Sequence, residues 1–159
     1  MIFIAVGTQK FQFNRLLTAI DVLVSTGGIK EEVFAQIGNS DYVPKHYPYA
    51  RMMEKAEFDN MISKCDLLIT HSGVGTIISG LQRSKPVIVV PRKQKFNEHI
   101  DDHQVQIADA FSEQNLVLKC DRVKNILSCI NEAKQHKFDR YISRNDAVIN
   151  EIETFLNNL

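Results

Sequence analysis

The fold is decided by residues 66–104, a segment that begins Asp66-Leu67-Leu68-Ile69-Thr70-His71-Ser72-Gly73-Val74-Gly75-Thr76. It joins an apolar run to a polar loop with two glycines, and a helical pattern then leads to a second apolar run, Val87 to Val90. Short runs that are apolar throughout are typical of strands buried on both faces of a parallel sheet. Because both runs end in polar residues, the two following loops are expected at one edge of the sheet, where α/β proteins bind ligands.

The same alternation extends in both directions along the chain. Strands are predicted at residues 2–6 and 32–37, with a helix between them whose apolar positions follow the 3.6-residue period. A short third strand is predicted at 51–53, a helix at 100–114, a short strand at 116–118, and two further helices before the C-terminus. The predicted fold class is α/β, a single Rossmann-like parallel sheet with helices on both faces.

Length and composition indicate one domain over residues 1–159, without an internal repeat or linker. Nineteen basic and nineteen acidic residues cancel, so no global field is expected to attract nucleic acid or an anionic membrane. The three cysteines lack CxxC spacing and are interpreted as reduced thiols in the cytosol. No apolar run approaches the roughly 20 residues that span a bilayer, so membrane association is expected to come from a partner.

Two glycine-bearing loops are expected to share a crevice at this edge. One is Gly7-Thr8-Gln9, and the other contains His71, Ser72, Gly73, Val74, Gly75 and Thr76. Glycine lets the backbone approach a ligand, and free N–H groups at the start of the next helix suit a diphosphate. The alternative is that the glycines only make the turns. Neither a GxGxxG motif nor a Walker loop is present, which disfavours dinucleotide and ATP binding.

A polar cluster follows the second apolar run: Glu98, His99, Asp102, His103 and Gln104. Carboxylate, imidazole and amide groups at this edge can bind the hydroxyl groups of a sugar, although acidic residues can also simply start a helix. The two histidines are spaced to share a metal ion, but no third ligand lies nearby, so neither a metal site nor a cofactor is predicted.

Basic residues surround the second apolar run, and Arg92 follows it immediately. That position is the one expected to contact a phosphate. A solvated basic face is the alternative interpretation of the remaining lysines and arginines.

These motifs, in this order, resemble the C-terminal donor-binding domain of family 28 glycosyltransferases. The resemblance covers about the whole chain and rests on residues 6–9, 70–76, 85–92 and 98–104. It is strongest to short stand-alone members, such as the cytosolic subunit of a two-part enzyme that extends dolichol-linked oligosaccharide, and related bacterial capsule and exopolysaccharide subunits. One position departs from the pattern, because Ser79 stands about where several relatives have a ribose-binding glutamate.

The resemblance implies the C-terminal half of a GT-B enzyme: an inverting, metal-independent UDP-glycosyltransferase subunit. It would transfer galactose, glucuronic acid or N-acetylglucosamine to a lipid-linked acceptor. A membrane-anchored partner subunit would hold the acceptor and supply the catalytic base, placing the chain in the cytoplasm at the inner membrane face. A C-terminal helix, at about 143–159, is a candidate for partner docking or for packing on its own domain. The alternative function is a non-catalytic nucleotide-sugar-binding or partner-stabilising module.

Overall fold

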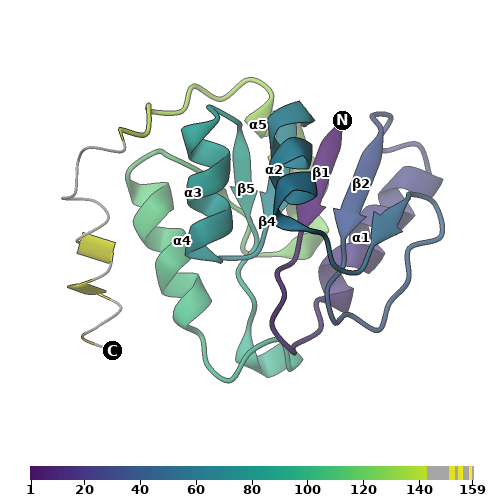
Figure 1. Ribbon diagram of the computed structural model, residues 1–159, viewed down its shortest axis with the longest axis horizontal. Helices are drawn as coiled ribbons and strands as arrows, with labels where there is room; N and C mark the ends of the chain where they lie inside the picture. Colours follow the sequence, from purple (N-terminus) through teal and green to yellow (C-terminus); the bar gives the residue numbers. More distant parts are fainter. Residues whose placement is uncertain (143–150, 153, 156–157, 159) are drawn as a thin grey trace.

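A computed structural model describes residues 1–142, 151, 152, 154, 155 and 158 of the chain, and its fold is a six-stranded parallel sheet flanked by helices (Figure 1). The strands are β1 Ile2–Ala5, β2 Val33–Gln36, β3 Tyr49–Ala50, β4 Leu67–Thr70, β5 Val87–Val89 and β6 Leu118–Lys119. The helices are α1 Asn14–Ser25, α2 Lys55–Lys64, α3 Val74–Gln82, α4 His103–Glu113 and α5 Ile126–Ala133, with 3-10 turns η1 Gln94–Phe96 and η2 Val123–Asn125.

The strand order is β3-β2-β1-β4-β5-β6, and every neighbouring pair is parallel. The chain therefore moves outward from β1 in one direction and from β4 in the other, which makes the β1/β4 pair the point where the topology reverses. At this pair Ala5 lies opposite Thr70, so the loops that leave both strands start side by side. In open α/β sheets this is the position of ligand crevices.

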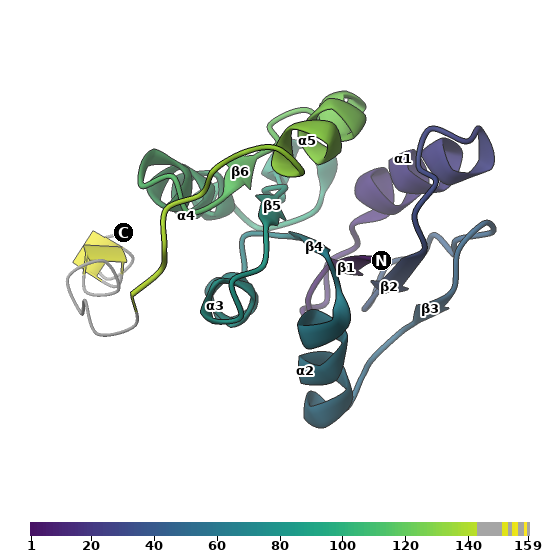
Figure 2. The ribbon, with the colours of Figure 1, turned by 90° about the horizontal axis from the view of Figure 1, so that it is seen from above.

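Helices cover both faces of the sheet, as Figure 2 shows, with α1 and α5 on one side and α2 and α3 on the other. The strand residues alternate between two buried clusters: Ile2 and Ile4 pack with α1 and α5, whereas Phe3 packs with α2, α3 and α4. A strand buried on both faces must be apolar at every position, which is why β1 and β4 carry apolar side chains throughout except Thr70. The predicted fold class is confirmed.

Three element boundaries predicted from the sequence were wrong, and one of them is that of β6, which lies at Leu118–Lys119 rather than at 116–118. The third strand lies at Tyr49–Ala50 rather than at 51–53, because the Pro48 carbonyl already accepts a hydrogen bond from Ala35 and brings the chain into register two residues earlier. Helix α4 starts at His103 rather than at residue 100. The Asp101 carboxylate accepts a hydrogen bond from the His103 N–H, which fixes the start of the helix there.

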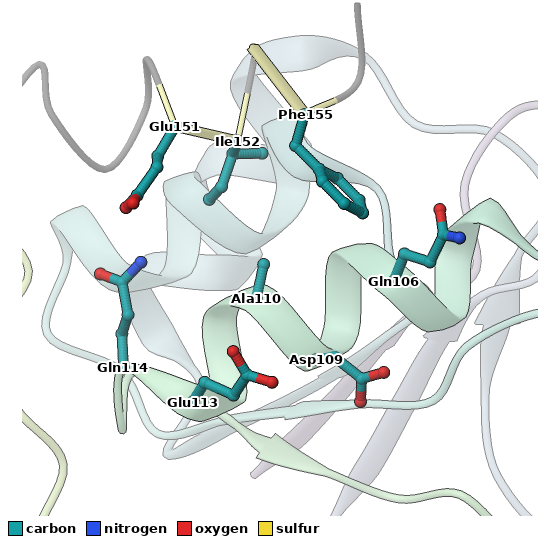
Figure 3. Close-up of a pocket in the computed structure, with 8 residues that line it drawn as sticks. All are labelled: Gln106, Asp109, Ala110, Glu113, Gln114, Glu151, Ile152 and Phe155. Atoms are coloured by element: carbon teal, nitrogen blue, oxygen red, sulfur yellow. The ribbon is translucent and has the colours of Figure 1, made fainter. Parts of the chain in front are cut away.

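Near the C-terminus, Ile152 packs against α4 and is buried, whereas Phe155 is partly exposed. Figure 3 shows Glu151, Ile152 and Phe155 facing α4 across a cavity of about 510 Å³. The C-terminal helix expected from the sequence carries an apolar stripe of Val148, Ile152, Phe155 and Leu156, of which Val148 and Leu156 lie outside the described residues. Among the described helices, none has the length and apolar composition needed to cross a membrane.

Candidate functional site

A cavity of about 420 Å³ lies at the carboxyl edge of the sheet, between the loop after β1 and the loop after β4. This edge is the lower one in Figure 1. The residues predicted from the sequence that line the cavity are Gly7, Thr8, Gln9, His71, Gly73, Gly75 and Thr76. The two glycine-bearing loops therefore share one crevice, as their positions after adjacent strands required.

His71 forms part of this cavity and is held between two glycines. A Cβ atom built on Gly7 would lie 2.7 Å from the imidazole Nε2, and one built on Gly73 would lie 2.4 Å from it. Thr70 donates its hydroxyl hydrogen to the Ala5 carbonyl at 2.8 Å, so the Nδ1–H of His71 is left to donate toward Thr70 Oγ1 at 3.2 Å. The glycines therefore make room for the ring, and this tautomer leaves Nε2 as a hydrogen-bond acceptor.

Burial keeps His71 neutral. The side chain is almost fully enclosed, and this burial, followed by the nearby Arg92 cation, lowers the pKa of His71 to about 4. The hydrogen bond toward the Ala5 carbonyl opposes the shift without reversing it. At neutral pH the imidazole therefore offers a lone pair, which suits a hydroxyl group of a ligand.

The start of helix α3 supplies the cavity with hydrogen-bond donors. Gly73 occupies the cap position, and Val74, Gly75 and Thr76 form the first turn, whose N–H groups have no partner inside a helix. A Cβ atom at Gly75 would meet nothing within 4 Å, so the backbone there is open to a ligand. The helix dipole and these N–H groups favour an anion such as a diphosphate.

Arg92, predicted to contact phosphate, is instead turned into the protein. Its guanidinium donates to the carbonyls of Phe11 at 2.9 Å, Gln12 at 3.0 Å, Glu98 at 3.3 Å and Val6. Burial lowers the pKa of Arg92 to about 10, which still leaves it a cation at neutral pH. In this structure the side chain joins the loop after β1 to the loop after β5 and does not line the cavity.

Glu98 is likewise fully buried rather than directed to the cavity. Its two carboxylate oxygens accept hydrogen bonds from Arg15 Nε at 2.8 Å and Arg15 Nη2 at 2.9 Å, and one also accepts from the Lys93 N–H. This bidentate pair connects α1 to the loop after β5. The Glu98 carboxylate is thus engaged by Arg15 and by the backbone of its own loop.

Gln104 connects two of the loops at the same edge. Its side-chain oxygen accepts hydrogen bonds from the backbone N–H groups of Ser72 at 3.3 Å and Arg92 at 3.0 Å. Gln104 and Ser72 are both buried, and the Ser72 hydroxyl has no hydrogen-bond partner among the described residues. Gln104 and Ser72 therefore support, from the protein interior, the loop that carries His71 and Gly73.

The remaining predicted residues, His99, Asp102 and His103, lie in the loop before α4 and at its first residue, and they do not line the cavity. The Asp101 carboxylate bridges His99 Nδ1 and His103 Nδ1, each at 3.0 Å. Burial would raise the pKa of Asp101, but the His103 N–H and the two imidazoles hold it below its ordinary value. Asp102 accepts from the Gln94 N–H at 2.9 Å. Within the described residues, no group of three potential ligands is arranged to hold a metal ion.

Four cavity residues were not predicted from the sequence: Gln36, Met53, Lys55 and Phe58. Lys55 places an exposed ammonium group beside the cavity, where it pairs with Asp59 at 2.7 Å, and Phe58 contributes an aromatic side chain from the first turn of α2. Gln36 is the last residue of β2, whereas Met53 was assigned to the misplaced third strand. With the strand at its observed position, residues 51–58 follow its carboxyl end and would have been recognised as part of the same edge.

A comparison with family models matches residues 1–157 to the glycosyltransferase family 28 C-terminal domain. Among curated proteins, the UDP-N-acetylglucosamine transferase subunit ALG13 of Homo sapiens is 25% identical over 142 residues, which are 84% of this chain and 12% of that protein. The protein of the same name from Candida albicans is 30% identical over 112 residues, which are 70% of this chain and 35% of that protein. The chain thus spans well under two thirds of the length of these relatives.

The fold is also found among solved structures. An NMR structure of ALG13 matches with a TM-score of 0.62 and 18% identity, covering 95% of this chain and 94% of that one. A crystal structure of the glycotransferase of kitacinnamycin matches with a TM-score of 0.63 and 15% identity, covering 98% of this chain and 38% of that one. At such identities the likeness concerns the fold alone.

Proposed function

This chain belongs to the glycosyltransferase family 28 C-terminal domain family, and on that premise we propose that it is the UDP-sugar-binding catalytic subunit of a two-component glycosyltransferase. The proposed reaction transfers a hexose to a lipid-linked acceptor in polysaccharide or oligosaccharide biosynthesis. N-acetylglucosamine is the first donor to test, because it is the sugar in the printed names of the relatives. Galactose and glucuronic acid are the other candidates.

The observation that carries this proposal is the cavity at the start of α3. It combines free N–H groups of a helix N-terminus with the Thr76 hydroxyl, both of which favour a diphosphate. The Lys55 ammonium group would join them by exchanging Asp59 for the ligand. Phe58 and Met53 add apolar surface on which a pyrimidine ring can pack. His71 Nε2 adds one acceptor for a hydroxyl group of the donor.

In the proposed mechanism the acceptor hydroxyl oxygen attacks the anomeric carbon while the bond from that carbon to UDP breaks, with inversion of configuration. The electron pair leaves with UDP, and the proton passes to a base on the partner subunit. Negative charge grows on the diphosphate as the bond breaks, so the α3 N–H groups, Thr76 and Lys55 would stabilise the transition state more than the ground state. These donors would make a divalent metal ion unnecessary.

The partner in this proposal is a membrane-anchored subunit that holds the acceptor, and the chain acts in the cytoplasm at the membrane face. The C-terminal segment remains a candidate docking element, although Ile152 already packs against α4. Alone, the chain should bind UDP and turn over poorly.

Titration calorimetry of the isolated protein with UDP tests the site. We expect binding, and we expect Thr76→Val to weaken it about tenfold, because the variant keeps the shape of the side chain and loses one hydrogen bond to a charged group. Thr18→Val, at an exposed position on α1 outside the cavity, is the matched control and should bind UDP as the wild type does. Absence of UDP affinity in the wild type would contradict the site assignment.

The alternative is a non-catalytic nucleotide-sugar-binding or partner-stabilising module. Thr76→Val also separates the two functions in a reconstituted pair of subunits. Loss of transferase activity with complex formation intact supports a catalytic subunit, and unchanged activity with weakened UDP binding supports the module.

A further inference from the structure

A second cavity, larger than the donor cavity at about 1020 Å³, lies between α1 and the turns that follow β5 and β6. We name it the basic groove and define it by Arg15, Lys93, Lys95, Phe96, Arg122 and Lys124. The sequence interpretation offered a solvated face for Lys93 and Lys95 and gave Arg15, Arg122 and Lys124 no role. The residues of the basic groove come from three segments far apart in the chain, which the parallel sheet brings together at its carboxyl edge.

The charge in the basic groove is largely uncompensated. Arg15 is matched by the buried Glu98, and Asp121, the one carboxylate in the lining, is paired at 2.9 Å with Lys119, which it shares with Asp109. The Asp121 carbonyl also accepts a hydrogen bond from Lys93 Nζ at 3.0 Å. The other four cations, Lys93, Lys95, Arg122 and Lys124, make no ion pair within the described part of the chain. A protein with no net charge therefore carries a locally cationic surface.

One exposed aromatic side chain, Phe96, stands among these cations. Phe96 is 40% exposed, and Ile100, on the same loop, is 67% exposed. The Arg15 guanidinium carbon and the Lys95 ammonium nitrogen stand over the Phe96 ring, at 4.5 and 5.0 Å from its centre. With cations over it, the ring is poorly placed to stack on a nucleobase, which disfavours single-stranded nucleic acid as the ligand. Exposed apolar side chains ringed by lysine and arginine are instead typical of surfaces that lie in a membrane interface.

We propose that the basic groove binds the phosphate headgroups of an anionic lipid surface, with Phe96 entering the interface. This chain would then contact the membrane directly, in addition to any contact made through a partner. The groove lies at the same edge of the sheet as the donor cavity, because α1, the loop after β5 and the loop after β6 all begin there (Figure 1). Lipid binding would therefore hold the donor cavity close to a lipid-linked acceptor.

Phe96→Trp provides the direct test, because the chain contains no tryptophan and the variant has a single fluorescent reporter in the basic groove. We expect its emission to shift to shorter wavelength with vesicles of about three parts phosphatidylcholine to one part phosphatidylglycerol, and not with pure phosphatidylcholine. Added salt should reverse the shift, because it screens exposed charges. An unchanged spectrum with both vesicles would overturn the proposal.

Co-sedimentation with the same vesicles, using the chain without the Phe96→Trp substitution, supplies a second readout. Each cation near an anionic surface strengthens binding about fivefold, so Arg122→Glu with Lys124→Glu should reduce binding about 25-fold or more. The matched control is Lys30→Glu with Lys64→Glu, which makes the same charge change at exposed positions before β2 and β4, at the opposite edge of the sheet. The control should bind the vesicles like the wild type, and equal loss in both variants would overturn the proposal.

Two further arms identify other ligands. If inorganic pyrophosphate binds the basic groove and vesicles do not, the groove is a site for a small soluble anion. If the protein retains single-stranded RNA and does not bind vesicles, the groove binds nucleic acid. Either result overturns the proposal. UDP calorimetry on the Arg122→Glu, Lys124→Glu variant should match the wild type. Because vesicle binding and UDP binding are measured separately, either proposal can fail without the other.

Discussion

Gly73, at the cap of α3, and Gly75, in its first turn, lie two residues apart and have different roles. At Gly73 a side chain would collide with the His71 ring, whereas at Gly75 it would extend into open space. The first glycine is therefore needed for packing inside the protein. The second is needed only if a ligand approaches the backbone. Substitution of Gly73 therefore tests packing, whereas substitution of Gly75 tests ligand binding.

We predict that Gly73→Ala lowers the free energy of unfolding by about 2 kcal/mol, because the added methyl group forces the His71 ring to move. Gly75→Ala should leave stability unchanged or raise it by up to about 1 kcal/mol, since the position lies within α3. If the proposed site is correct, Gly75→Ala also weakens UDP binding. Urea unfolding and calorimetry on both variants provide the measurements, and Gly75→Ala with wild-type UDP affinity would contradict a close backbone contact.

His71 makes stability depend on pH. Its pKa is about 4 in the folded protein and 6.5 in the unfolded chain, so between these values the unfolded state binds more protons. The free energy of unfolding should therefore fall as the pH drops below 6.5. From pH 7 to pH 5 the contribution of His71 is about 2 kcal/mol. His71→Gln removes the titrating imidazole, so between pH 7 and pH 5 the free energy of unfolding of the variant, measured with urea, should fall by about 2 kcal/mol less than that of the wild type. An equal fall in the two proteins would refute the assignment of His71 as buried and neutral.

Among the elements, the loops at the carboxyl edge are held by charged side chains directed inward. Arg92 joins the loop after β1 to the loop after β5, and the Arg15–Glu98 pair joins α1 to the latter. Gln12 adds a hydrogen bond from its amide to the Phe96 carbonyl at 2.9 Å. Because these contacts fix loops that strands alone would leave free, they position both the donor cavity and the basic groove.

We predict that Arg92→Lys lowers the free energy of unfolding by about 3 kcal/mol, because a lysine cannot reproduce the planar fork that reaches four carbonyl groups. Arg140→Lys, at an exposed position, is the control and should change stability by less than about 0.5 kcal/mol. Urea unfolding gives the free energies. If Arg92→Lys kept full stability and lost UDP affinity instead, Arg92 would be the phosphate ligand that the sequence first indicated.

At the scale of the whole molecule, the two cavities divide the carboxyl edge. The donor cavity lies over β1 and β4, where the strand order reverses, and the basic groove lies toward β5 and β6 on the side of α1. One edge of a single sheet could thus bind a soluble donor and contact a lipid surface. Both proposals depend on the same feature, the parallel direction of all six strands, which directs every strand end to this edge.

The sequence by itself determined the fold class and the main strands, because buried parallel strands require continuous apolar runs and the helices require a 3.6-residue period, and both patterns are local. It also predicted the two glycine loops that meet at the donor cavity. Only the tertiary structure decided which polar side chains face that cavity. Arg92 and Glu98 look like ligands in a linear sequence and are buried in the protein, whereas Lys55 and Phe58 reach the cavity from the first turn of α2. The basic groove was equally hidden, because net charge is a sum over the chain and says nothing about which residues become neighbours.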